Sequence, residues 1–197
     1  MTTRRLQKQL EFIVEIDKLK RILRQTNVIQ DRTNENDAEH SWHLAVMVIL
    51  LEEYSNTKNL DVAKVMKMVL IHDLVEIDAG DTYCYDYEAA KDKKERELKA
   101  ANRIFALLPE DQANELRGIW DEFEERKQPE AKFAAAMDRL QPLLLNFNTL
   151  GVSWKKHGVK KHEVIERVRY IADGSKELWE FAIWLINESV RRGFLAV

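Results

Sequence analysis

A short stretch near the middle of the chain concentrates side chains that can bind a metal ion or transfer a proton. It runs from His72 to Asp81 and reads HDLVEIDAGD. On a helix His72 and Glu76 share one face, and Asp73 lies about 100° further round and can reach the same point. Gly80 is a helix stop, after which a loop can turn Asp81 back toward that point.

The same stretch also fits a surface helix with one charged face. Against that interpretation, His72 and Asp73 directly follow an apolar run, so at least one of them should point inward. The run contains Val62, Val65, Met66, Val69 and Leu70. A buried charged group needs a partner or a metal ion. This stretch alone leaves both interpretations open.

A single histidine stands at the start of another apolar segment. Residues 38–54 are predicted to form a helix, and its apolar run from Leu44 to Leu51 indicates that this helix is buried. His40 therefore lies at the mouth of a buried helix. His43, one turn further on, is better explained as a solvated or hydrogen-bonded side chain.

A single aspartate stands in a second buried helix, predicted over residues 131–150. Asp138 is flanked there by alanine, methionine and leucine. Pro142 follows four residues later and has no N–H for the carbonyl of Asp138, so a kink is expected. A lone aspartate beside a kink indicates a site. Asp138 could instead pair with Arg139 or cap a new helix that starts near Pro142.

Together these positions offer two imidazoles and two carboxylates, which suit a borderline divalent ion such as Mn, Fe, Co, Ni or Zn. Structural zinc sites more often use cysteine, and the chain has only Cys84. An ion with four protein ligands keeps room for water and substrate, and it activates water for hydrolysis. Glu76, on the His72 face, can move protons or orient that water.

The composition favours a helical protein. The 197 residues suit one domain with a sizeable core, and only six glycines and three prolines disfavour a turn-rich or all-β fold. Seven or eight helices and no convincing strand are expected, in a compact all-α bundle. The predicted helices are residues 4–25, 38–54, 61–80, 91–108, 110–125, 131–150, 161–172 and 175–192. Residues 27–36 and the basic segment 154–162 are expected to be loops.

Charge and hydropathy exclude several classes of function. Charged residues make up 33% of the chain, but the net charge is only −3, so no general attraction to nucleic acid is expected. The longest apolar run is too short to span a bilayer, and the N-terminus does not resemble a signal peptide. One cysteine excludes an internal disulfide bond. A soluble cytoplasmic protein without membrane partners is expected.

In its motifs the sequence resembles the HD-domain metal-dependent phosphohydrolases, and more closely their bacterial 5′-deoxynucleotidase-like branch. The likeness covers roughly residues 15–150, and the core motifs lie within 24–150. They are Glu39-His40-Ser41, the stretch from His72 to Thr82, and Pro129-Glu130-Ala131-Lys132-Phe133 leading to Asp138. The resemblance implies one HD-type domain over 1–197 that includes C-terminal helices within 160–192.

The resemblance also implies roles for particular residues. One divalent metal ion would be bound by His40, His72, Asp73 and Asp138. Glu76 and Asp81 match the acidic positions of the family that act in catalysis and contact substrate. Arg24, at the end of the first predicted helix, matches an arginine that contacts phosphate. The branch places an aromatic residue beside that arginine, whereas this chain has Gln25, which puts its preference for deoxyribose in doubt.

The resulting hypothesis is hydrolysis of a small phosphomonoester by metal-activated water, with a (deoxy)nucleoside 5′-monophosphate as the expected substrate. Two-metal phosphodiesterases need further metal-binding histidines before the last aspartate, and none lies between His72 and Asp138. The alternative is a non-catalytic HD-fold module that binds a metal or nucleotide. The presence of all four ligands together with Glu76 and Asp81 favours the enzyme.

The last predicted helix bears aromatic residues outside its main apolar stripe. Phe181 and Trp184 fall on the side that also carries Glu177, Glu180 and Glu188. Exposed aromatic residues of this size indicate an interface, and the resembling family is commonly dimeric, so a homodimer is expected. Alternatively, a neighbouring loop covers both side chains.

Overall fold

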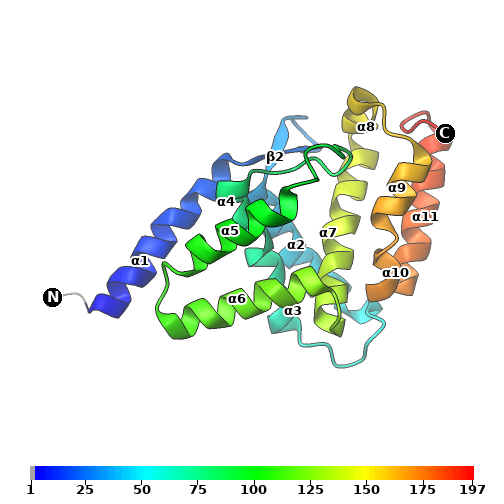
Figure 1. Cartoon of the computed structure of the whole chain (residues 1–197). Coiled ribbons are helices and arrows are strands. Elements are labelled where there is room, and N and C mark those ends of the chain that lie inside the picture. Colours follow the sequence, from blue (N-terminus) through cyan, green and yellow to red (C-terminus); the bar gives the residue numbers. More distant parts are fainter. Residues whose placement is uncertain (1–2) are drawn as a thin grey trace.

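Helices make up most of the computed structural model, which describes residues 3–197 (Figure 1). The longer ones are α1 (Arg4–Ile16), α2 (Asp37–Leu51), α3 (Val62–Ile71), α5 (Lys93–Phe105), α6 (Glu110–Glu125), α7 (Pro129–Asn148), α9 (Lys161–Val168) and α11 (Lys176–Arg191). The short α-helices are α4 (Glu76–Ala79), α8 (Val152–His157) and α10 (Ile171–Gly174), and the 3₁₀ helices are η1 (Asp17–Arg21), η2 (Glu52–Tyr54) and η3 (His72–Val75). The all-α fold class expected from the sequence is confirmed.

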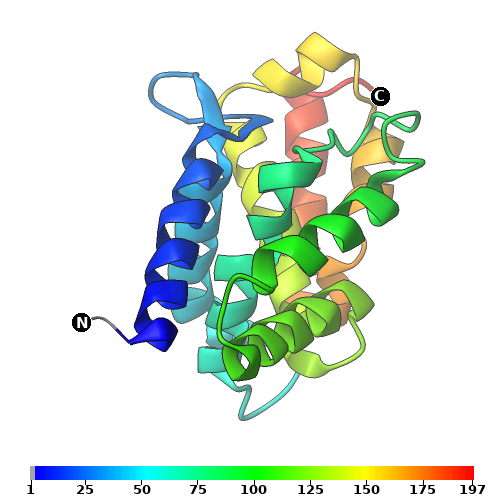
Figure 2. The same cartoon turned by 60° about the vertical axis from the view of Figure 1, so that its left-hand side comes forward.

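Helix α7 runs through the middle of the molecule (Figures 1 and 2). It packs against α2, α3 and α6, which precede it in the sequence, and against α10 and α11, which follow it. Phe133, Met137 and Leu140 of α7 are buried in the main hydrophobic core. Asp138 lies among these residues and is also buried. No helix in the described part of the chain is long and apolar enough to cross a membrane.

The chain after α1 differs from the expectation. The helix predicted over residues 4–25 ends at Ile16, the 3₁₀ helix η1 follows, and the chain then becomes extended. Strands β1 (Leu23–Asn27) and β2 (Asn34–Asn36) form an antiparallel hairpin. The N–H of Val28 donates to the carbonyl of Thr33 over 2.8 Å and closes the hairpin loop. Arg24 therefore lies on a strand, and the prediction that it ends the first helix is wrong.

The segment predicted as one helix over 61–80 is divided. Asp61 caps α3 by accepting from the N–H of Lys64, and α3 ends at Ile71. The 3₁₀ turn η3 follows and leads into α4. Gly80 then ends α4: its N–H donates to the carbonyl of Glu76 over 2.8 Å, and its φ of 74° suits glycine.

Three further local features concern the ends and the course of the helices. Asn36 caps α2 in a capping box with Glu39. Helix α7 continues through Pro142, so no new helix starts there for Asp138 to cap. The segment 154–162 is not wholly a loop, because α8 extends to His157, where glycine follows in a left-handed conformation.

Candidate metal centre

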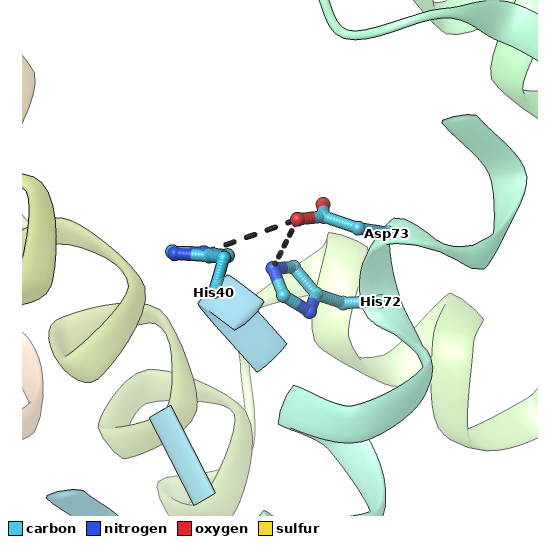
Figure 3. A group of neighbouring side chains, drawn as sticks. All are labelled: His40, His72 and Asp73. Atoms are coloured by element: carbon cyan, nitrogen blue, oxygen red, sulfur yellow. Dashed lines mark ion pairs between the residues drawn. The ribbon is translucent and has the colours of Figure 1, made fainter. Parts of the chain in front are cut away.

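The structure brings the four proposed ligands together from three elements. His40 comes from α2, His72 and Asp73 come from η3, and Asp138 comes from α7. One ligand atom each of His40, His72 and Asp73 lies within 4.8 Å of the others (Figure 3). The Oδ1 of Asp138 lies 3.1 Å from Nε2 of His40 and 3.7 Å from Nε2 of His72. All four side chains are buried, which excludes the surface-helix interpretation.

Hydrogen bonding orients the His72 ring. Its Nδ1–H donates to the backbone carbonyl of Val69 over 3.0 Å, because a carbonyl oxygen can only accept. The lone pair of neutral His72 is then on Nε2, 3.2 Å from Oδ2 of Asp73. The indole N–H of Trp120 on α6 holds the same residue by donating to its carbonyl over 3.1 Å. His72 thus presents Nε2 to the two carboxylates.

His40 is oriented from the opposite side by Gln141 of α7. Nδ1–H of His40 donates to Oε1 of Gln141 over 3.1 Å. The amide nitrogen of Gln141 donates in turn to the buried carboxylate of Glu35 and contacts His43 at 3.2 Å. Nε2 of His40 consequently faces Asp138. His43 is not one of the clustered side chains. This agrees with the sequence, which favours a solvated or hydrogen-bonded side chain at this position.

The charges of this cluster favour the binding of a cation. Although burial opposes it, the carboxylates of Asp73 and Asp138 raise the pKa of His72 to about 10. Burial, together with Arg24, lowers the pKa of His40 to about 4. Nε2 of His72 is buried and has no hydrogen-bond partner in the part of the chain described. Two imidazole nitrogens and two carboxylates with converging atoms fit a divalent ion.

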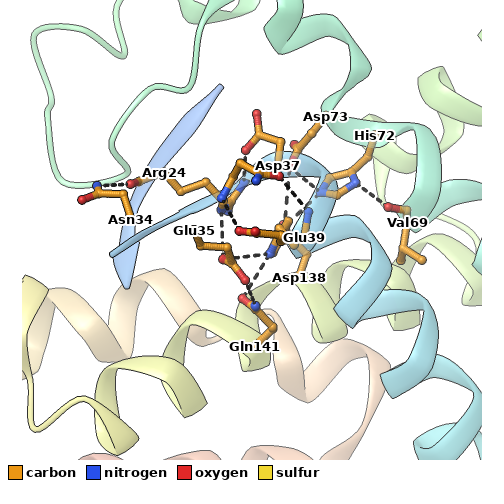
Figure 4. A network of polar contacts seen from close by, with 12 residues as sticks. Arg24, Asn34, Glu35, Asp37, Glu39, Val69, His72, Asp73, Asp138 and Gln141 are labelled. Atoms are coloured by element: carbon orange, nitrogen blue, oxygen red, sulfur yellow. Dashed lines mark hydrogen bonds and ion pairs between the residues drawn. The ribbon is translucent and has the colours of Figure 1, made fainter. Parts of the chain in front are cut away.

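Arg24 reaches the cluster from the hairpin. Its Nη1 lies 2.9 Å from Oδ2 of Asp73 and 3.0 Å from Oδ1 of Asp37 (Figure 4). Its Nε lies 3.7 Å from Oε2 of Glu35. Sequence reasoning missed both Glu35 and Asp37, which flank the helix cap Asn36. Their position beside the cap explains why they are buried, since the start of α2 faces the site.

The two acidic positions beyond the His–Asp pair also reach the site. Glu76 is buried, and its Oε2 has no hydrogen-bond partner in residues 3–197. Burial and the carboxylates of Asp73 and Asp37 raise the pKa of Glu76 well above its ordinary value. Asp81 follows Gly80 and is half-buried, and burial raises its pKa. A proton can therefore be held at this edge of the cluster.

A cleft of about 780 Å³ opens onto these residues. His72, Asp73 and Asp138 line it, and so do Arg24, Gln25, Glu76 and Asp81. Aromatic side chains from the segment after Asp81, Tyr83 and Tyr85, form another part of its wall. His40 lies beneath this surface and is fully buried. The cluster is thus accessible from one side to a small molecule and to water.

The family follows from comparison with known proteins. The model of the HD domain family matches residues 16–179, and the chain belongs to this family. The chain is 53% identical to a predicted metal-dependent phosphohydrolase from Magnetospirillum magnetotacticum MS-1 of known crystal structure. That match has a TM-score of 0.94 and covers 98% of this chain and 96% of the other.

Curated relatives share the same region at lower identity. The chain is 29% identical over 145 residues to the 5′-deoxynucleotidase HDDC2 of Bos taurus, covering 73% of this chain and 69% of the relative. It is 30% identical over 136 residues to the 5′-deoxynucleotidase HDDC2 of Homo sapiens, covering 68% and 65%. The chain therefore spans about two thirds of these relatives, and the sequence-based assignment to the HD-domain phosphohydrolases is confirmed.

Proposed function

We propose that this protein is a metal-dependent phosphohydrolase that removes the phosphate from a small phosphomonoester, a (deoxy)nucleoside 5′-monophosphate being the preferred class. The observation that carries this proposal is the convergence of His40, His72, Asp73 and Asp138 in one buried cluster beneath a cleft. The names of its relatives, a 5′-deoxynucleotidase and a metal-dependent phosphohydrolase, support the same activity.

The four clustered side chains would hold one divalent ion, either Mn, Fe, Co, Ni or Zn. When bound, such an ion acts as a Lewis acid toward the phosphoryl group and lowers the pKa of water. Other residues of the chain fix the orientation of these ligands. Val69 holds the ring of His72, and Gln141 holds the ring of His40, so that both Nε2 atoms face the carboxylates.

Glu76 is the proposed proton acceptor. Its buried Oε2 has no internal partner in the described chain and lies at the cleft, where it can take a proton from the attacking water. Burial and the nearby carboxylates raise the pKa of Glu76, which makes its carboxylate a stronger proton acceptor. Asp81 lines the same cleft and is proposed to accept a hydrogen bond from a sugar hydroxyl.

Arg24 is proposed to bind the phosphoryl group. Its guanidinium can bind phosphate through two parallel hydrogen bonds. In the present structure Asp73 and Asp37 hold its Nη1, which fixes the side chain at the cleft beside the metal cluster. Gln25, the next residue on β1, accepts from Nε2 of His157 over 3.2 Å. Gln25 stands where the resembling branch has an aromatic residue, so weak discrimination between deoxyribose and ribose is expected.

Further properties belong to the same proposal. Residues 1–197 are proposed to act as one HD-type domain, because α7 joins the motif-bearing helices to α10 and α11.

A homodimer in the cytoplasm is proposed, formed through the exposed face of α11. Phe181 and Trp184 stack there with ring centroids 5.7 Å apart, and they are 40% and 55% exposed. The alternative that a loop covers them is wrong.

The test of the proposed activity is phosphate release by protein loaded with Mn²⁺ or Co²⁺. The substrates are 2′-deoxynucleoside and ribonucleoside 5′-monophosphates beside the matched 3′-monophosphates. Release from the 5′-monophosphates, with much slower release from the 3′-isomers, is expected. Hydrolysis of none of them by protein shown to contain metal would rule out the nucleotidase and leave another phosphoester or a binding module.

A further inference from the structure

A second group of cationic side chains lines the cleft and has no part in the proposed mechanism. Arg139 comes from α7, Arg167 from α9 and Lys93 from α5. These helices are distant in sequence from the hairpin that carries Arg24. The cleft therefore has cationic groups from two separate parts of the chain.

The three cationic groups differ in how far they are neutralised. Nζ of Lys93 lies 3.2 Å from Oε1 of Glu97, which supplies a counter-charge. Arg139 donates through Nη1 to Oδ2 of Asp138, but its Nε is buried and has no partner in the described chain. Arg167 forms no ion pair or hydrogen bond with a carboxylate of residues 3–197. The two arginines thus retain unused donors at the cleft.

The arginines also repel each other. Burial and the nearby guanidinium of Arg139 lower the pKa of Arg167, so the folded protein disfavours the positive charge there. Two like charges held in a partly desolvated cleft are unfavourable unless anions lie beside them. Asp138 pairs with Arg139, whereas Arg167 pairs with no carboxylate of the described residues. The position of this pair is therefore better explained by a bound anion than by its contribution to stability.

The chemistry of the pair indicates which anion. Guanidinium groups bind phosphate oxygens in a planar, bidentate manner. Arg24, the proposed contact of the phosphate that is hydrolysed, pairs with Asp73 and Asp37. Arg139 pairs with a different carboxylate, that of Asp138. The cleft of about 780 Å³ lies in the upper part of the ~300–1,000 Å³ range of small-molecule sites. Space and charge are both available for a second anionic group.

We propose that Arg139 and Arg167 form a subsite for a second phosphate group of the substrate, in addition to the phosphate that is hydrolysed. Within the proposed class of nucleotides with a 5′-phosphate, the preferred substrates are then those that carry a second phosphate elsewhere. This inference rests on the proposed function and narrows its substrate class.

The test compares two nucleotides that differ only in the second phosphate: 2′-deoxyadenosine 5′-monophosphate and 2′-deoxyadenosine 3′,5′-bisphosphate. Loss of the 5′-phosphate is followed by chromatography of the products. The metal-loaded protein should favour the bisphosphate by about tenfold in kcat/KM, as expected for a charge-assisted contact. Arg167→Gln should lose most of this preference. Arg169→Gln should retain it, because Arg169 is an exposed residue of the neighbouring turn that pairs with Glu166.

Two kinetic results would overturn the subsite. The first is a wild-type protein that shows no preference for the bisphosphate. The second is an equal loss of kcat/KM for both nucleotides in Arg167→Gln, which would place Arg167 at the reacting phosphate. Thermal unfolding adds a readout for folding: Arg167→Gln should unfold at the same or a higher temperature, because it removes a repulsion. A lowered unfolding temperature would assign Arg167 a structural role.

Calorimetric titration separates this inference from the proposed activity. The bisphosphate should bind wild-type protein about tenfold more tightly than the monophosphate, and Arg167→Gln should remove the difference. If neither nucleotide is hydrolysed but this difference in binding is found, the proposed function fails and the subsite stands. If both nucleotides are hydrolysed and bind equally, the function stands and the subsite fails.

Discussion

Nδ1–H of His40 donates to Oε1 of Gln141 over 3.1 Å, although the two residues are 101 positions apart in the sequence. The contact joins the start of α2 to the middle of α7. It fixes which nitrogen of His40 faces Asp138, and the hydrogen bond from Gln141 to Glu35 fixes the amide in turn. The proposed metal site therefore depends on residues that do not bind metal themselves.

Replacing Gln141 should weaken metal binding without removing a ligand. Gln141→Met keeps most of the side-chain volume but deletes the acceptor that orients His40. Loss of such an outer hydrogen bond typically costs about 10–100-fold in metal affinity. Competition with a chromophoric chelator measures the affinity. The control is Asn148→Ala on the exposed side of α7, which should bind as wild type does. Equal affinities for both variants and wild type would reject the role of Gln141.

Removing a ligand should abolish binding. His72→Ala and Asp138→Ala should each lose the metal, and they should unfold at lower temperature than the metal-loaded wild type because ligation stabilises the folded state. His162→Ala, at an exposed position of α9, is the matched histidine control and should keep its metal. Full occupancy of His72→Ala in elemental analysis would show that the ligand assignment is wrong.

Glu76 is expected to act in the chemical step and not in metal binding. Because four other groups are the proposed ligands, Glu76→Ala should retain metal while kcat falls by about 10²–10⁴-fold, the range typical of a general acid–base group. Glu95→Ala, an exposed change on α5, should leave both quantities unaltered. Metal content and phosphate release are measured on the same samples. A wild-type rate in metal-loaded Glu76→Ala would eliminate the proposed proton transfer.

The residue beside Arg24 is expected to set sugar discrimination. Gln25 lines the cleft and bonds to His157, whose ring lies 4.4 Å from that of Tyr83. The wild-type ratio of kcat/KM for deoxyribonucleotide over ribonucleotide should therefore be small. Gln25→Trp should raise this ratio by adding an aromatic surface against the sugar. Gln25→Asn keeps the amide and should not raise the ratio. A ratio that is unchanged in Gln25→Trp would contradict the explanation.

The aromatic pair on α11 predicts the state of assembly. Light scattering of the wild type at micromolar concentration should give the mass of a dimer. Trp184→Glu should give a monomer with unchanged phosphate release, because the residue is exposed and is absent from the cleft lining. A wild-type monomer under these conditions rejects the dimer.

The sequence predicted the helical fold and the buried cluster for a clear physical reason. His40 stands at the start of an apolar segment, and His72 and Asp138 lie within apolar segments. Polar groups in such places must find partners in the core. The caps Asn36 and Asp61 were also predictable, since each is a local relationship within a few residues.

The remaining features depend on contacts between distant residues or on weak local signals. The spacing of apolar residues in α1 continues past its end, so nothing local showed that the chain turns into strand β1 at Leu23. Glu35 and Gln141 lie 106 positions apart and meet only in the folded chain. In the sequence, pairing with Arg139 is an alternative to a site role for Asp138. That pairing exists, but Asp138 contacts His40 and Arg139 through different oxygens at the same time.

The most direct test of the central claim is a metal titration of chelator-treated protein, followed by phosphate release from a 2′-deoxynucleoside 5′-monophosphate. Aliquots of Mn²⁺ or Co²⁺ are added, and both bound metal and rate are measured at each step. The account predicts no release without metal and a rate that rises in proportion to bound metal until it levels off at one ion per chain. Release by metal-free protein, or no release at full occupancy, would contradict it.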